Sequence, residues 1–169
     1  MDCMRNIIVA VILSGLSATV KAQVLAVSTD VAWLATQTYN AAAELTISSR
    51  STLGLNIMGN YHPWALHDMR MIVLQPEWRY YFSGRAMAYH YVGIHGLVAN
   101  YDFVWKDERH HGDAIAGGFT LGYALPLSER WNVDFHAGLG LAFYHEEAKS
   151  VGTMILPTRI GVSLSYIRR

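Results

Sequence analysis

The sequence predicts an eight-stranded antiparallel up-and-down β-barrel that spans a membrane, and three observations lead to this fold class. The first is a long alternation from Trp131 to Tyr144, in which every second residue is apolar. The second is a set of seven further segments with the same two-residue period. The third is a shortage of charge: only 15% of the 169 residues are charged, whereas about 25% is usual in soluble domains.

The segment from Trp131 to Tyr144 has the period of a β-strand with one apolar face and one polar or small face. The alternation places an apolar residue at seven successive alternate positions, so the segment is longer than the average strand of about five or six residues. The twelve steps from Trp131 to Phe143, at about 3.3 Å each and tilted by about 40°, rise roughly 30 Å, close to the apolar band of a membrane barrel. The aromatic residues at its ends fall where interfacial girdles are expected.

The first 22 residues predict a secretory signal peptide that is cleaved after Ala22. Arg5 precedes a short apolar run from Ile7 to Leu13, and small residues follow, which is the order of a signal sequence. The run is shorter than the about 20 residues that a membrane-spanning helix needs. The single cysteine, Cys3, lies in this segment. We therefore expect a barrel domain over residues 23–169 without disulfides or thiolate ligands.

Eight segments are expected to form the strands, with no competing helical period after Ala22. Pro76 lies inside the fourth segment and predicts a β-bulge there, because proline cannot donate a ladder hydrogen bond. The connections after the third, fifth and seventh segments are expected to be the longer, polar loops 62–68, 103–112 and 145–153, as on the outer side of a membrane barrel. The expected strands are Val24–Ala35, Ala41–Arg50, Leu53–Tyr61, Met69–Phe82, Ala88–Tyr101, Asp113–Leu125, Trp131–Tyr144 and Met154–Ile167.

The composition of the face opposite the apolar one indicates whether lipid or water surrounds the barrel. This face carries arginines and carboxylates among glycine and alanine, and no lysine. Because unpaired buried charge is costly, this composition favours a closed polar lumen in which the charges pair. His95 and His136 are expected in the lumen as well, whereas Leu156 and Thr158 are expected on the lipid face. The predicted structural network of the lumen is Asp30, Glu44, Arg50, Glu77, Arg79, Asp134 and Arg159.

No catalytic site, metal site or cofactor emerges from the motifs. The adjacent His110 and His111 point apart on a chain and have no third ligand at a suitable spacing. There is no G-x-S-x-G elbow, and no outward histidine or carboxylate that would suit a lipid-modifying enzyme. The net charge is zero and no basic block occurs, which argues against nucleic acid as a partner. The architecture is porin-like, but the interior of eight strands is just filled by side chains, which favours a plug over a channel.

Several phrases of the sequence are typical of one family. They are Pro76–Phe82, Gly93–Gly96, Gly117–Leu127, Trp131–Asp134, Gly138–Gly140 and Pro157–Leu164. Together they resemble the small outer-membrane β-barrel family of Bacteroidota that is classed as a domain of unknown function, whose genes often lie near fimbrial clusters. The resemblance implies no reaction and no catalytic residues. The chain ends in Ile167-Arg168-Arg169, where many outer-membrane barrels end in an aromatic residue.

We therefore expect a monomeric protein of the Gram-negative outer membrane with a structural or interaction role at the cell envelope. Its partners would be outer-membrane lipid and an envelope or fimbrial protein. The alternatives are an envelope lipid-modifying enzyme and a soluble periplasmic ligand-binding barrel. The side chains expected to meet a protein partner are Trp64, Trp105, Asp107, Glu108, Arg109 and His110.

Overall fold

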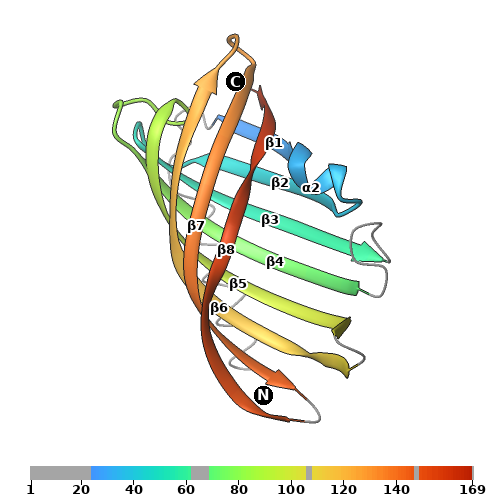
Figure 1. Ribbon diagram of the computed structural model, residues 1–169. Coiled ribbons are helices and arrows are strands. Elements are labelled where there is room, and N and C mark those ends of the chain that lie inside the picture. Colours follow the sequence, from blue (N-terminus) through green and yellow to red (C-terminus); the bar gives the residue numbers. More distant parts are fainter. Residues whose placement is uncertain (1–23, 62–68, 106–107, 147–148, 169) are drawn as a thin grey trace, which may run out of the picture.

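Eight antiparallel strands close into one barrel, with each strand paired to its neighbours in the chain and β8 paired to β1 (Figure 1). The structure is a computed structural model that describes residues 24–61, 69–105, 108–146 and 149–168. The predicted fold class is confirmed, whereas the expected signal peptide lies outside the described residues. The elements are β1 (Leu25–Asp30), α2 (Val31–Ala35), β2 (Tyr39–Thr46), β3 (Ser51–Tyr61), β4 (Met69–Tyr81), β5 (Tyr89–Trp105), β6 (Glu108–Pro126), β7 (Trp131–Glu146) and β8 (Lys149–Arg168).

The wall of the barrel is uneven, because the strands range in length from 6 residues in β1 to 20 in β8. The stretches 103–112 and 145–153, which were expected to be loops, instead extend the β5–β6 and β7–β8 hairpins. Val104 pairs with Arg109, and Glu146 pairs with Lys149. The prediction was wrong because it took the polar composition of these stretches as a sign of a loop. Beyond the apolar band of the barrel, a hairpin can carry polar side chains on both faces, because the hydrogen bonds that pair its strands are made by the backbone.

A short helix, α2, replaces the second half of the first expected strand. Asp30 caps it, and its Oδ1 accepts hydrogen bonds from the backbone N–H groups of Ala32 at 2.9 Å and Trp33 at 3.3 Å. Aspartate is among the best residues for this role. The prediction that the first strand continues through Trp33 was therefore wrong, because the capping side chain of Asp30 turns the backbone away from the sheet.

The β-bulge lies on β8 and not at Pro76. Leu74 pairs with Val98 and Glu77 with His95, so the register between β4 and β5 is the same on both sides of the proline. On β8, by contrast, Gly138 pairs with Arg159 but Leu139 pairs with Pro157. Thr158 is the extra residue.

This bulge reverses the facing of the preceding part of β8. Leu156 lines a space inside the barrel, and Thr158 is buried with 8% of its surface exposed. Both were expected on the lipid face. A shift of one residue exchanges the two faces of a strand, so the uninterrupted alternation assumed for β8 was wrong at these two positions.

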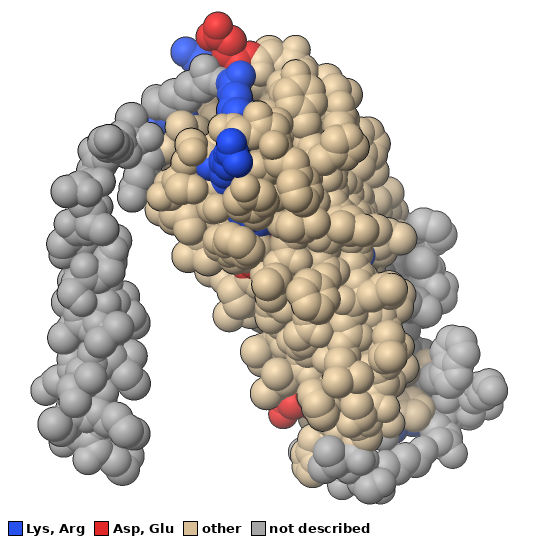
Figure 2. Space-filling model, turned by 90° about the vertical axis from the view of Figure 1, so that its left-hand side faces the viewer, with Lys and Arg blue, Asp and Glu red and all other residues tan. Residues whose placement is uncertain are grey.

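The outer surface of the barrel is apolar and the inner surface is polar. Phe119 and Leu139 point outward with 70% and 62% of their surface exposed, while Thr52, Gln75 and Thr120 are buried. Figure 2 shows a flank almost free of charge, with charged side chains gathered mainly at the upper end of the view. This is the reverse of the polarity of a soluble barrel. Within the described residues, no helix is long and apolar enough to cross a membrane.

The outward position of Leu139 leads to a test of the facing. Leu139→Arg is expected to lower the free energy of unfolding in lipid vesicles by about 2–4 kcal/mol, because it places a charge in the apolar band. Urea titration of the protein in vesicles measures this. Leu127→Arg is the matched control, since Leu127 is exposed in the turn after β6 and its replacement should change stability little. Equal effects of the two substitutions would contradict the assignment.

Candidate functional site: the ion network and cavity of the lumen

A buried guanidinium, that of Arg79 on β4, holds together carboxylates from three strands. Its Nη1 donates to Glu44 Oε2 of β2 at 2.9 Å and to Asp134 Oδ2 of β7 at 3.0 Å. Its Nε donates to Glu77 Oε2 of β4 at 2.7 Å. All four side chains point inward because each occupies one of the alternate positions of its strand that face the lumen. The network therefore crosses the lumen.

Two tyrosines donate further hydrogen bonds to two of these carboxylates. Tyr81 donates to Glu44 Oε1 at 2.8 Å, and Tyr91 donates to both oxygens of Asp134 at 3.0 Å. Each tyrosine is only 1% exposed. The ring of Tyr91 lies under the Arg79 guanidinium and directly over Gly122, where an added Cβ would clash with the ring. Aromatic rings therefore fill the lumen around the ion network.

A second group of contacts continues the network towards α2. His136 Nε2 lies 3.2 Å from Asp30 Oδ2, and Arg159 Nη1 lies 3.3 Å from Glu77 Oε2. Arg159 Nη1 also donates to Gln75 Oε1 at 3.3 Å. The structure thus brings together in the lumen six of the seven residues expected there, namely Asp30, Glu44, Glu77, Arg79, Asp134 and Arg159.

Arg50 is the exception, and its expected place in the lumen is wrong. It is exposed in the turn between β2 and β3, where its Nη1 donates to the Tyr80 hydroxyl at 3.3 Å. The second strand was expected to run to residue 50, but β2 ends at Thr46. The chain then turns tightly, with the backbone N–H groups of Ile47 and Ser48 donating to Ser51.

His95 ties β5 to β6 and β8. Its Nδ1 lies 2.9 Å from Thr120 Oγ1, and its Nε2 lies 2.7 Å from Thr158 Oγ1. The parity of β5 predicts the inward position of His95. Parity also gives the inward positions of Tyr81 and Gln75, which lie two residues from members of the predicted network. Thr158 gave no such signal, because its inward position depends on the bulge.

One end of the lumen is sealed by the turn between β4 and β5. Met87 packs against Ala26 and Ile167, and its carbonyl accepts a hydrogen bond from Asn132 Nδ2. Met87 has a φ of 60°, a conformation that is uncommon for residues other than glycine. We call this the Met87 end. Around the ion network lie two small spaces of about 10 Å³ each, about the room that one water molecule needs.

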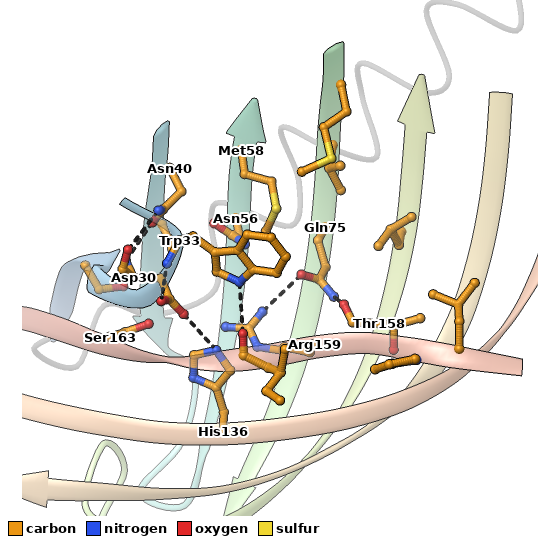
Figure 3. A pocket seen from close by; sticks show the side chains of 18 residues that line it. Asp30, Trp33, Asn40, Asn56, Met58, Gln75, His136, Thr158, Arg159 and Ser163 are labelled. Atoms are coloured by element: carbon orange, nitrogen blue, oxygen red, sulfur yellow. Dashed lines mark hydrogen bonds and ion pairs between the residues drawn. The ribbon is translucent and has the colours of Figure 1, made fainter. Parts of the chain in front are cut away.

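The other end, the α2 end, contains a cavity of about 180 Å³ (Figure 3). It lies between Trp33 of α2 and a polar floor that includes Arg159, Gln75 and His136. In the part of the chain that the structure describes, no group of three or more His, Cys, Asp or Glu side chains is arranged to hold a metal ion.

The side chains expected to meet a protein partner are only partly described. Arg109 forms an ion pair with Asp102 across the β5–β6 hairpin, with Nε 2.9 Å from Oδ1, and the His110 ring stacks on Phe103. Trp64 and Asp107 lie outside the described residues. Trp105 and Glu108 lie on the paired backbone of the hairpin, and their side chains are likewise outside the description.

A closed antiparallel barrel of eight strands with an apolar exterior and a polar, filled interior is a transmembrane β-barrel. The chain belongs to the family described as "Protein of unknown function (DUF3575)", whose model matches residues 8–168. The recognition of a family of unknown function is thereby confirmed.

The chain is similar to the N-terminal β-barrel domain of OprF from Pseudomonas aeruginosa, with 11% identity and a TM-score of 0.49, over 86% of this chain and 96% of that chain. A comparison with curated proteins found no match.

The position of Arg79 leads to a second test. Arg79→Met keeps the bulk of the side chain but leaves Glu44, Glu77 and Asp134 without their shared cation. We expect the free energy of unfolding to fall by about 3–5 kcal/mol, because breaking a buried ion pair leaves uncompensated charge. Urea titration in lipid vesicles measures the loss. Arg109→Met breaks an exposed pair and should have little effect, so an equally small loss for Arg79→Met would contradict the importance of the network.

Proposed function

We propose that this protein resides in the outer membrane of a Gram-negative cell as a closed barrel with a structural or interaction role. The observation that carries the proposal is the combination of an apolar outer wall with the Arg79 ion network across the lumen. A band of exposed apolar side chains around a closed barrel suits a lipid environment. The filled lumen argues against a role as a channel.

The closure of the lumen rests on three layers of side chains. Met87 blocks one end, the rings of Tyr81 and Tyr91 lie above it, and the Arg79 network crosses the middle. The tyrosine layer is hydrogen-bonded to the ion network, and the Met87 layer is hydrogen-bonded to β7. Moving ions through them would require several buried contacts to break together.

An interaction role would use the hairpins that rise beyond the apolar band. The β5–β6 hairpin is stiffened by the Asp102–Arg109 ion pair and the Phe103–His110 stack, so it presents a defined surface. We propose an envelope protein as its partner, and a fimbrial or surface protein is the candidate that the family resemblance suggests. The comparisons give no positive indication of an enzymatic activity.

Purified protein tests the location and the closure together. After folding into lipid vesicles, it should migrate differently in gels before and after boiling, as membrane barrels do. In planar bilayers it should give no sustained conductance steps, while a general porin in the same bilayers gives them. Sustained steps from this protein would contradict the closed lumen.

Fractionation of the producing cells tests the location independently. The protein should be found in the outer-membrane fraction, and mass spectrometry of its N-terminus should show processing after Ala22. Recovery of the folded barrel in the soluble periplasmic fraction would favour the soluble alternative.

A further inference from the structure

The cavity at the α2 end is large enough to hold a small molecule. Its volume is about 180 Å³, and an engineered protein cavity of about 150 Å³ is known to bind benzene. By this comparison, a ligand of about six to eight non-hydrogen atoms fits inside. The ion network and Met87 close the lumen beyond it, so the cavity leads nowhere.

One side of the cavity is apolar. Met58 and Met71 line it from β3 and β4, and Leu97 and Leu156 line it from β5 and β8. Leu156 reaches this position because of the bulge at Thr158. The indole of Trp33 lies over the cavity (Figure 3), and its Nε1 donates to the carbonyl of Ile160 at 2.9 Å. This hydrogen bond fixes the indole ring. The thioether and aliphatic side chains of the methionines and leucines, by contrast, adapt well to an apolar ligand.

The floor of the cavity carries a cation, Arg159, whose positive charge is only weakly balanced by neighbouring carboxylates. Arg159 has one carboxylate contact, with Glu77 at 3.3 Å, and Glu77 also binds Arg79 at 2.7 Å. Arg79 has three carboxylate partners, whereas the Nε of Arg159 is buried without a hydrogen-bond partner among the described residues. A buried guanidinium gains from a further charged acceptor.

Among the described residues that line the cavity, Asp30 is the one carboxylate, and both of its oxygens already have partners. Its Oδ1 accepts from the backbone of Ala32 and Trp33, and its Oδ2 faces His136. Polar capacity is therefore left at Arg159, which has one carboxylate partner, and at His136, whose Nδ1 has no hydrogen-bond partner among the described residues. Such a floor beneath an apolar wall matches a molecule with an anionic head and a hydrocarbon body.

We propose that this cavity binds a small amphipathic monocarboxylate, such as a short-chain fatty acid. The carboxylate accepts hydrogen bonds from Arg159, and the hydrocarbon chain lies against Met58, Met71, Leu97 and Leu156 beneath Trp33. Eight strands leave too little room for a larger head group at this depth. The binding site depends on the barrel interior alone, so it stands or falls separately from the proposed role at the envelope.

Methionine methyl NMR of the folded protein in nanodiscs tests this proposal, with hexanoate as the probe. Hexanoate should shift the methyl signals of Met58 and Met71 saturably, with a Kd of about 1 mM or below for a ligand of this size. The signal of Met87, at the sealed end, should stay unchanged and serves as the internal control. Hexanol and hexylamine share the hydrocarbon chain but lack the carboxylate, and they should bind at least about tenfold more weakly, since they lack the charged hydrogen bond.

Two substitutions and one control substitution locate the binding. Arg159→Gln should weaken hexanoate binding at least about tenfold. Ala42→Leu, which fills the cavity from β2, should abolish it, whereas Ala137→Leu on the exposed face of β7 should leave it unchanged. If Arg159→Gln does not fold, Ala42→Leu and the comparison of the three probes decide the question.

The proposal is overturned if hexanoate causes no saturable shift of Met58 and Met71. It is also overturned if hexanol or hexylamine binds as tightly as hexanoate, or if a folded Arg159→Gln or Ala42→Leu variant binds hexanoate like the original protein.

Discussion

The structure depends on one buried cation, the guanidinium of Arg79, and on the three carboxylates that surround it. Removing these four charged groups from water costs free energy that only good geometry offsets. That geometry exists only when β2, β4 and β7 are in their native register, because a slip of one residue would turn Glu44 or Asp134 out of the lumen. The network therefore fixes the relative register of β2, β4 and β7, which are not paired to one another, and it does so through the interior of the barrel.

The exterior imposes the complementary constraint. Lipid cannot satisfy backbone hydrogen bonds, so a sheet in a membrane must close on itself, as β8 does on β1. Closure leaves an interior that side chains can just fill, and large polar groups there need small neighbours. Gly122 under Tyr91 and Gly161 beside Asp30 show this, because a Cβ at either position would clash with the facing side chain. The glycines of the polar face are thus part of the packing of the network.

The facing of a side chain can be predicted from the sequence where the two-residue period is unbroken. It cannot be predicted where a bulge, a cap or a turn interrupts that period. The alternation places Glu77, Arg79 and Asp134 correctly in the lumen, because each lies within an unbroken two-residue period. It fails for Leu156 and Thr158, since one extra residue on β8 exchanges the faces of the strand. It fails for α2, where the Asp30 side chain outweighs the pattern. It also places Arg50 inside, because the end of β2 is set by a turn and not by apolarity.

These deviations are also what create the cavity. The cap at Asp30 ends β1 early and places Trp33 over the lumen, while the bulge at Thr158 turns Leu156 inward. A perfectly regular barrel with this sequence would direct Leu156 to the lipid and would lack the indole. Because the Arg79 network and Met87 close the lumen beyond the cavity, a ligand can enter and leave only at the α2 end. Such a site can hold or sense a small molecule on one side of a membrane, but it cannot carry the molecule across.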